Sequence, residues 1–420
     1  MPQITAEQRK KNNRLYIVQA AVEYHISLLM TGSFFAALTT GLGMSDALTG
    51  VLSSVISLGC VFQLLSLLLR PRRSRAFVTV LSVFNQLLFA SLYAIPFLPG
   101  SDRLRIALFV AVILLAYLIY HIAHPQKVGW MMCWVEDSTR GIFTANMQIF
   151  SLLTGMAFSL IMGAVSDYFR NRDRELAAFA VCGLAVLVLM VVHTALLRRV
   201  SDREIPYPAA GSILRRFAAV LRIREVRRIT VLYVIWHAAN YAAVPFYGTY
   251  QIKELGFSLT LVSVLSILGC LVRAVVSRAW GNYGDRRSFP VMVRLGFVLA
   301  AVGFAACAFA APGRALVPFA VYNLLYGVSQ GAVEIGRTNL IFDVVPEEQR
   351  ADAVALTQSL CGLAGFFSTL VFSVVVTAVQ RGGNAIWGIS CYAQQLVSVA
   401  AALLAVAAAG YAHVALVKKK

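Results

Sequence analysis

The chain has 420 residues, is 59% hydrophobic and only 13% charged, and carries a formal net charge of +18. A soluble protein would carry about twice that share of charged residues, so the composition excludes an ordinary soluble globular protein. The seven cysteines are dispersed in or beside apolar runs, which excludes a disulfide framework and a cysteine-based metal site.

Twelve apolar runs follow one another along the chain, each close to the roughly 20 residues that a helix needs to cross a bilayer. Because backbone polar groups in hydrocarbon must be satisfied within the protein, we expect each run to be a helix. Residues 1–16 are polar and basic, and the first apolar run is too long for a cleavable signal, so the first helix should remain as an anchor. The predicted membrane helices are 17–41, 47–69, 76–98, 104–124, 143–166, 176–197, 229–252, 259–280, 290–311, 315–336, 353–378 and 388–416.

The second half of the chain repeats parts of the first half at an offset of about 210 residues. Residues 135–160 match residues 345–370 at seven of 26 positions, where chance would give about two or three. The repeat predicts an all-α membrane protein with twelve transmembrane helices in two six-helix bundles. The bundles would be 1–197 and 229–420, joined by a linker at 198–228.

The basic residues gather on one side of the predicted membrane. With the N-terminus in the cytoplasm, the cytoplasmic tails and loops hold 28 of the 37 Lys and Arg residues, and the opposite loops hold 8. This asymmetry is the positive-inside pattern. It predicts a multi-pass protein of the plasma or inner membrane with both termini in the cytoplasm. The positive net charge is therefore explained by the orientation of the protein in the membrane and by contact with anionic lipid headgroups, and binding of nucleic acid is not expected.

The largest basic block is the predicted linker, which carries nine arginines. Apolar residues recur at helical spacing between these arginines, at Ile213, Leu214, Phe217, Val220 and Leu221. This pattern predicts an amphipathic helix that lies on the cytoplasmic surface and tethers the two bundles. A ligand-binding role for the block is the alternative.

The cytoplasmic turn after the eighth predicted helix contains Gly281, Gly284, Asp285, Arg286 and Arg287. This stretch resembles the G-x-x-x-D-R-x-G/R-R/K signature of the major facilitator superfamily, and the resemblance to the family extends over nearly the whole chain. The corresponding first-half stretch, 69–74, is shorter and lacks the aspartate of the signature. The resemblance implies the fold of that family and transport by alternating access.

A second stretch, 339–350, resembles the family's turn between the tenth and eleventh helices. It contains Asp343 and Arg350, and its first-half counterpart contains Glu136 and Arg140. These turns are candidates for a conformational latch. A carboxylate such as Asp285 can accept hydrogen bonds from the N-terminal amides of a neighbouring helix, and Arg350 can pair with Asp285 or with Asp343. The alternative is an ordinary loop with surface ion pairs worth about 0–1 kcal/mol.

Ionisable side chains at membrane depth cost about 2.5–3.5 kcal/mol each on insertion scales, and they therefore indicate function. The repeat aligns two of them, Glu334 and Arg337, with His124 and Lys127. We expect the set to line a substrate cavity, with a structural ion pair near the cytoplasmic mouth as the alternative. The candidates at membrane depth are Glu23, Arg273, Glu334 and Arg337.

Further polar side chains lie on the first, fourth and seventh predicted helices, which line the central cavity in the family that the chain resembles. Each could bind a solute or simply form an interhelical hydrogen bond. Arg273 could attract an anionic group or extend toward the cytoplasm. Glu23 and the histidines are the candidate proton carriers, because burial favours a neutral carboxyl and histidine titrates near working pH. The polar side chains are His25, His121, His237, Asn240 and Tyr241.

The leading hypothesis is a secondary active transporter for a small polar organic solute, sugar-like or an organic anion, with proton coupling permitted. A transport-inactive receptor or scaffold on the same fold is the alternative, because the first cytoplasmic signature is incomplete. No P-loop, HExxH or GxSxG motif is present, which disfavours a pump with its own nucleotide site. An enzyme is not expected: a membrane-embedded enzyme acting on lipid, the third hypothesis, would need a paired acid and base or a nucleophile in the bilayer, and only scattered histidines are present. We expect no cofactor and no metal, a monomeric state, and two partners, the solute and the lipid bilayer.

Overall fold

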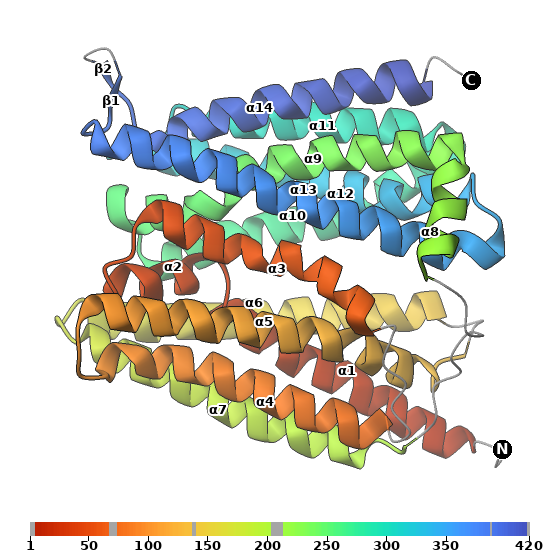
Figure 1. The fold of residues 1–420 in the computed structure, drawn as a ribbon, viewed down its shortest axis with the longest axis horizontal. Coiled ribbons are helices and arrows are strands. Elements are labelled where there is room, and N and C mark those ends of the chain that lie inside the picture. The colour runs from red at the N-terminus through yellow and green to blue at the C-terminus, as the bar shows by residue number, and fades with distance from the viewer. Residues whose placement is uncertain (1–4, 67–73, 137–139, 203–212, 387–388, 418–420) are drawn as a thin grey trace. The chain divides into compact units, whose positions relative to one another are not determined.

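The computed structural model describes residues 5–66, 74–136, 140–202, 213–386 and 389–417. Its helices group into two compact units, which are described separately (Figure 1). Unit 1 consists of Met1–Met44, Phe62–Pro208 and Ser258–Ser263, and unit 2 consists of Ser45–Val61, Ala209–Phe257 and Val264–Lys420. The units differ from the predicted sequence halves, because residues 45–61 group with unit 2 and residues 258–263 with unit 1.

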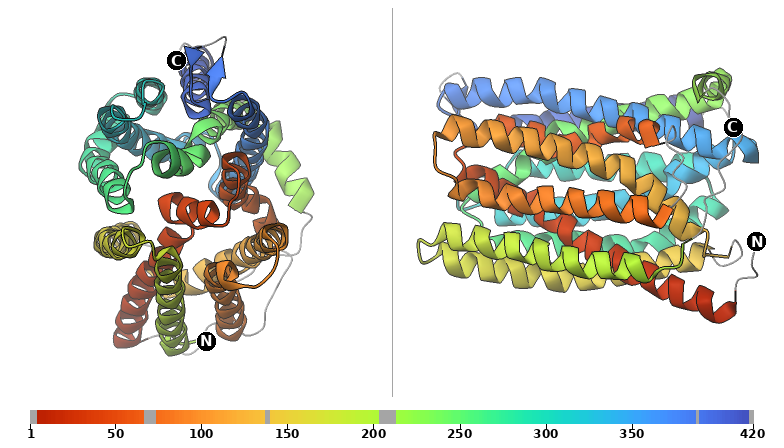
Figure 2. Two further views of the ribbon diagram at one scale, coloured as in Figure 1. Left: turned by 90° about the vertical axis from the view of Figure 1, so that its left-hand side faces the viewer. Right: turned by 60° about the horizontal axis from the view of Figure 1, so that its bottom comes forward.

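Unit 1 is helical throughout its described part. In it, α1 packs against α6 and α7, and α4 packs against α5 and α7. The two orientations of Figure 2 show α4 and α7 running alongside each other. Its helices are α1 (Ala6–Leu29), α2 (Gly32–Gly41), α4 (Ser74–Ala94), α5 (Asp102–Met132), α6 (Arg140–Arg170) and α7 (Glu175–Arg199), with a short 3₁₀ turn, η1 (Ile95–Phe97), after α4.

The first predicted helix, 17–41, is in fact two helices. Helix α1 runs from Ala6 to Leu29, and the helical conformation is interrupted before α2, whose first residue, Gly32, has a φ of 57°. Only glycine adopts this left-handed conformation without a steric penalty from Cβ. Thr31 Oγ1 donates to the carbonyl oxygen of Ser27 at 2.8 Å, which satisfies one carbonyl at the end of α1.

Unit 2 also contains mostly helices in its described part. In it, α11 packs against α12 and α14, and α9 packs against α13 and α14. Its elements are most of α3 (Asp46–Ser66), α8 (Ile213–Arg222), α9 (Arg224–Thr249), η3 (Tyr250–Glu254), most of α10 (Leu259–Arg286), α11 (Phe289–Cys307), α12 (Leu316–Phe342), α13 (Glu347–Arg381), β1 (Ala385–Ile386), β2 (Ile389–Ser390), α14 (Ala393–Ala412) and η4 (His413–Val417).

Two segments of unit 2 bear on the predictions. The expected amphipathic helix is α8, which packs on α9 and α13 and buries Phe217 and Val220 while Arg215 and Arg222 stay exposed. The expected start of the last helix at residue 388 is wrong. The strands β1 and β2 pair antiparallel, with Ala385 opposite Ser390, and α14 starts only at Ala393.

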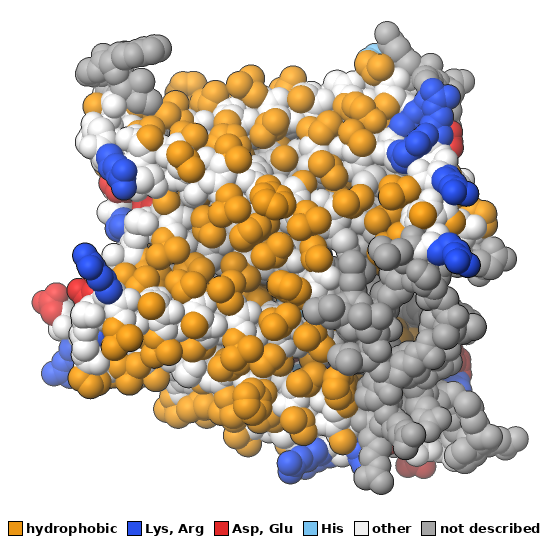
Figure 3. Space-filling view, in the orientation of Figure 1, with side chains coloured by type: hydrophobic (Ala, Val, Ile, Leu, Met, Phe, Trp, Pro, Cys, Tyr) orange, Lys and Arg blue, Asp and Glu red, His pale blue; other side chains and the backbone are white. Residues whose placement is uncertain are grey.

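Eleven helices of the described chain are long and apolar enough to cross a membrane, and α3 contributes a shorter apolar stretch, Asp46–Gly59. Large apolar side chains such as Val275 and Phe309 are more than three-quarters exposed, at 77% and 79%. Figure 3 shows hydrophobic side chains covering the sides of the helices, with Lys and Arg near the helix ends. This surface suits lipid tails rather than water, and it confirms the predicted helical membrane class. Twelve helices in two six-helix bundles stays a prediction.

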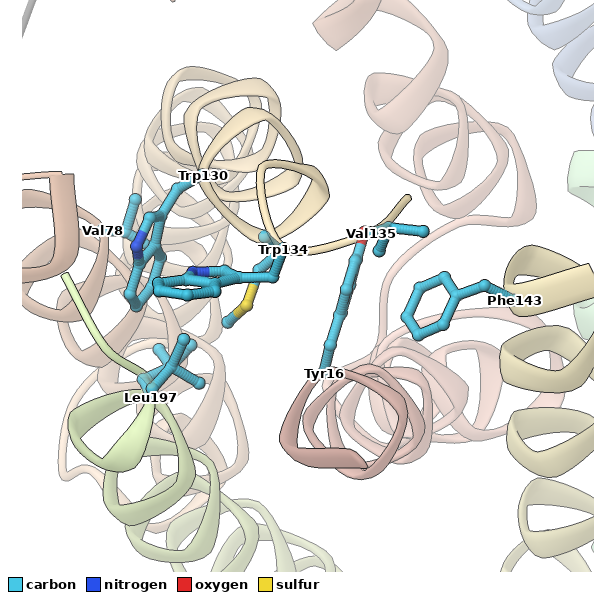
Figure 4. Packing of buried hydrophobic residues seen from close by; sticks show 9 residues of the cluster. Tyr16, Val78, Trp130, Trp134, Val135, Phe143 and Leu197 are labelled. Carbon is cyan, nitrogen blue, oxygen red and sulfur yellow. The ribbon is translucent and has the colours of Figure 1, made fainter. Parts of the chain in front are cut away.

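Each unit has an aromatic core. In unit 1, the ring of Tyr16 packs beside that of Phe143, with centroids 5.2 Å apart, and Trp130 and Trp134 lie near Leu197 (Figure 4). The indole nitrogen of Trp130 donates to the carbonyl oxygen of Ser201 at 3.2 Å. This core therefore fixes the start of α1 against the end of α5. In unit 2, the corresponding aromatic residues are Trp236, Phe297, Phe304, Tyr322 and Tyr326.

Candidate functional site

The charged centre of unit 1 joins two helices. Glu23 on α1 accepts a hydrogen bond from the ammonium group of Lys127 on α5. The Lys127 side chain is only 3% exposed and that of Glu23 is 21% exposed. His124 lies one helical turn before Lys127, with its Nδ1 3.9 Å from a Glu23 oxygen. The structure therefore assigns Lys127 as the partner of Glu23, which repeat alignment alone does not reveal.

A second polar chain crosses unit 1 beside this centre. His193 on α7 is fully buried, and its ring nitrogens lie 2.9 Å from Gln86 Nε2 and 3.0 Å from Gln19 Oε1. Sequence reasoning missed these residues. The available signal was spacing, because Gln19 and Glu23 are four residues apart and share one face of α1. The chain of side chains links α1, α4 and α7 through hydrogen bonds.

The predicted histidines of unit 1 already have protein partners. His25 lies with Nε2 3.1 Å from Thr154 Oγ1 and stacks on Phe158 with ring centroids 4.9 Å apart. His121 is 3% exposed and meets the ring of Tyr120 edge-on at 5.1 Å. Both side chains therefore contribute to helix packing. The half-buried His25 is the one that retains access to its surroundings.

The charged pair of unit 2 lies within one helix. Arg337 donates to Glu334 at 2.6 Å, three residues away on α12. Both side chains are partly exposed, Glu334 by 34% and Arg337 by 23%. Val333 directly precedes Glu334, and its carbonyl oxygen accepts a 3.0 Å hydrogen bond from the hydroxyl of Tyr233 on α9. This contact aligns α9 beside the pair.

The other predicted polar residues of unit 2 lie on α9 and α10. Asn240 accepts a 2.5 Å hydrogen bond from the hydroxyl of Tyr326 on α12. His237 donates from Nδ1 to the carbonyl oxygen of Tyr233 at 3.0 Å and stacks parallel to Tyr241. These three contacts place a half-buried polar and aromatic surface on α9 and α12. Arg273 on α10 is exposed and forms no ion pair with any described residue.

Most of the second cytoplasmic signature lies within a helix. Helix α10 continues to Arg286, and α11 starts at Phe289. A Cβ added at Gly284 would lie 2.5 Å from the Phe289 ring, so glycine permits that ring to pack, whereas Gly281 has open space around it. The side chain of Asp285 lies outside the described residues. Two exposed cations follow it, Arg286 and Arg287.

Arg350 does not pair with Asp343 in this structure. Its guanidinium group donates to the carbonyl oxygens of Val345 and Phe342, both at 3.3 Å, and stacks over the Phe342 ring at 5.0 Å. These carbonyls follow the end of α12, where a cation is favoured. Asp343 is exposed and forms no ion pair with a described residue.

In the first-half counterpart, Glu136 forms an ion pair with Arg9 at the start of α1. The side chain of Arg140 lies outside the described residues. Latching by these residues stays a prediction.

Sequence reasoning missed two aspartates that hold helix ends together. In unit 2, Asp46 at the start of α3 is buried and accepts from Lys253 at 3.0 Å, from Gln380 at 2.8 Å and from Gln394 at 2.9 Å. The partners lie on η3, α13 and α14, so one carboxylate ties four elements of unit 2. A carboxylate in the first turn of a helix is a common cap, so the sequence gave no reason to single it out.

In unit 1, Asp167 near the end of α6 caps the first turn of α10. It accepts from the backbone nitrogens of Leu259 at 3.0 Å and Thr260 at 2.9 Å, and from the Thr260 hydroxyl at 2.5 Å. A Cβ at Gly163, one turn earlier, would lie 3.2 Å from Thr260 Cα, so glycine permits this approach. The first N–H groups of a helix have no partner within it, and Asp167 satisfies two of them.

Comparison with known proteins identifies the family. Residues 15–369 match the Major Facilitator Superfamily. The chain belongs to this superfamily. In addition, 78 residues are 31% identical to Protein NRT1/PTR FAMILY 5.10 of Arabidopsis thaliana, a match that spans 17% of this chain and 14% of that protein.

Solved structures share the fold. The nucleoside transporter NupG is 12% identical, with a TM-score of 0.70 over 96% of this chain and 97% of its own. A bacterial homologue of the human lysosomal transporter Spinster is 11% identical, with a TM-score of 0.71 over 97% of each chain. A D-xylose-proton symporter is 16% identical, with a TM-score of 0.64 over 94% of this chain and 96% of its own. The superfamily member described here is a multi-pass membrane protein, and Glu23 and Lys127 lie in two of its candidate membrane spans, Ala6–Gly41 and Asp102–Met132.

Proposed function

We propose that this chain is a secondary active transporter that carries a small polar organic solute across the cytoplasmic membrane by alternating access. The observation that carries the proposal is the pair of repeat-related polar centres within apolar helices. His124 and Lys127 with Glu23 form one centre, and Glu334 with Arg337 forms the other. Charge at membrane depth is costly and marks solute or ion pathways. Partial exposure of Glu334 and Arg337 leaves hydrogen-bonding capacity for a solute.

The polar surfaces suit a solute with hydroxyl or carboxylate groups and one flat face. In unit 2, His237 and Tyr241 offer stacked rings, and Arg337 offers a planar donor for a carboxylate. In unit 1, His25 is the half-buried donor or acceptor. A sugar-like solute or an organic anion meets this description. Solved structures of similar fold include the nucleoside transporter, the D-xylose-proton symporter and a POT family peptide transporter, so the classes to test are nucleosides, D-xylose and peptides.

Proton coupling is part of the proposal. Glu23 is a carboxylate held by Lys127, with the imidazole of His124 beside it. Proton uptake by Glu23 would release Lys127, and the released ammonium group could then bind an anionic solute group. The D-xylose neighbour is named as a proton symporter, which supports testing this coupling first.

The remaining parts of the mechanism are proposals of the same kind. We place both termini and the linker 198–228 in the cytoplasm, and we assign twelve spans to two six-helix bundles that move as a monomer. The cytoplasmic latch would comprise Gly281, Gly284, Asp285, Arg286, Arg287, Asp343, Arg350, Glu136 and Arg140. Exposed charges at helix ends, such as Arg286 and Asp343, are free to change partners between conformers.

Uptake by the purified protein in liposomes tests the proposal. Radiolabelled nucleosides, dipeptides, pentoses and organic acids would be offered with an inward proton gradient, with and without an uncoupler. We expect uptake of one class, lost in Lys127→Gln and retained in the surface variant Arg103→Gln. Binding of a solute by folded protein without flux would contradict transport and support the receptor alternative.

A further inference from the structure

A cavity of about 320 Å³ opens in unit 1 at the beginning of α1, away from the charged centre around Glu23. It lies within the first turns of the span Ala6–Gly41, where a membrane helix leaves the hydrocarbon for the headgroup layer. Of its lining residues, transport as proposed above uses only Glu136, as a member of the latch. Its walls are formed by Arg9, Lys10, Asn13, Arg14, Ile17 and Glu136.

The charge of this cavity is positive. Arg9 is paired with Glu136, which closes one wall. Lys10 and Arg14 are exposed and form no ion pair with any residue that the structure describes. They are four residues apart, so they lie on one face of α1, one turn above the other. The cavity is therefore lined by two cations without an ion pair, Lys10 and Arg14, and by one neutral ion pair, Arg9 with Glu136.

Asn13 adds a neutral polar group between the cations. Its Oδ1 atom is buried and has no hydrogen-bond partner among the described residues. The amide nitrogen of the same side chain carries two N–H groups that can donate to an anion. Ile17 forms the apolar wall one turn further along the helix. The cavity thus combines cationic groups, an amide and an apolar wall, which is the composition of a site for an amphiphilic anion.

We propose that this cavity binds a phosphate group, either of an anionic lipid headgroup or of a free phosphate compound. Arg14 offers a planar pair of donors and Lys10 a point charge, and these are the two side chains that most often bind phosphate. Asn13 would donate to a third oxygen. Ile17 favours the lipid, because an acyl chain can lie against it while the phosphate stays between the cations.

The test compares two double variants of the full chain that lose the same charge. Lys10→Gln with Arg14→Gln removes the unpaired cations of the cavity. Lys11→Gln with Arg103→Gln removes two exposed cations that do not line it. Each purified protein is stripped of lipid and its melting temperature is recorded with phosphatidylcholine, with added phosphatidylglycerol, and with inorganic phosphate.

We expect phosphatidylglycerol to raise the melting temperature of the parent and of the Lys11/Arg103 variant, because a ligand that binds the native state stabilises it. The Lys10/Arg14 variant should need about tenfold more phosphatidylglycerol for the same shift, since each cation contributes to binding of an anionic headgroup. An equal shift with inorganic phosphate would identify a free phosphate compound as the ligand. Equal responses of the two double variants, or no response of the parent to either phosphate source, would overturn the proposal.

Discussion

The two charged centres occupy repeat-related positions but are built differently. In unit 1 the carboxylate of Glu23 lies on α1 and its cation, Lys127, lies on α5. In unit 2 both members, Glu334 and Arg337, lie on α12. Lys127 is almost fully buried at 3% exposure, whereas Arg337 is 23% exposed. One centre therefore joins two helices, and the other presents its charges on the surface of one helix.

The difference shows how duplicated positions can acquire separate tasks. A buried pair between helices needs both members, because either charge alone is unfavourable in a low-dielectric interior. A pair within one helix turn contributes only a few tenths of a kcal/mol and can open at little cost. We infer that the unit 1 centre changes its protonation and its ion pairing during the conformational change. The side chains of the unit 2 centre are more exposed and are therefore better placed to bind a solute.

The largest effect should follow removal of the buried cation of unit 1. Lys127→Met leaves Glu23 buried without its partner, which we expect to destabilise the protein by about 3–5 kcal/mol. Thermal unfolding of the purified variant measures this loss. The double variant Glu23→Gln with Lys127→Met should recover most of the stability but not the uptake. A single variant as stable as the parent would show that Glu23 is already neutral.

Substitution of Asp46 tests whether the loss of stability depends on how many helices a charged side chain links rather than on its depth in the membrane. Asp46→Asn replaces an acceptor of three hydrogen bonds by a group with one acceptor oxygen. We expect a loss of about 1.5–3 kcal/mol, because hydrogen bonds to charged groups are the strong ones. Asp102→Asn is the matched control, since Asp102 is 82% exposed and pairs with Arg105 within one helix turn at 3.4 Å. Similar losses in both variants would contradict this explanation.

A smaller effect is expected from the neutral interhelical contact of unit 1. Thr154→Val removes the hydroxyl that meets His25 at 3.1 Å while keeping the shape of the side chain. The loss should be about 0.5–1.5 kcal/mol, as for a typical neutral hydrogen bond. Unfolding in the same detergent measures it. If Thr154→Val also abolishes uptake at full stability, His25 contacts the solute rather than only the neighbouring helix.

The smallest change in stability should come from the centre in unit 2. Arg337→Gln breaks an ion pair within one helix turn, so stability should fall by only about 0.2–0.5 kcal/mol. We nevertheless expect uptake to fall at least as far as in Glu334→Gln, with a raised KM for the solute. Normal uptake kinetics in both variants would reduce the pair to a structural feature and remove the functional contrast between the units.

The sequence alone determined that the chain is built mainly of apolar helices and that it is a membrane protein. Hydrophobic runs of fixed length force a helix because hydrocarbon satisfies no backbone polar group. The spacing of Phe217 and Val220 between arginines likewise predicted the amphipathic α8. Local chemistry also explains one wrong prediction, since Gly32 lies inside the apolar run 17–41 and its left-handed conformation separates α1 from α2.

Tertiary structure alone decided which polar groups meet. Glu23 and Lys127 are 104 residues apart, and Asp46 lies 334 and 348 residues from Gln380 and Gln394. Such pairs depend on the rotation and packing of whole helices. Hydrophobic periodicity places a side chain on a face of its helix without naming the neighbour that the face will meet.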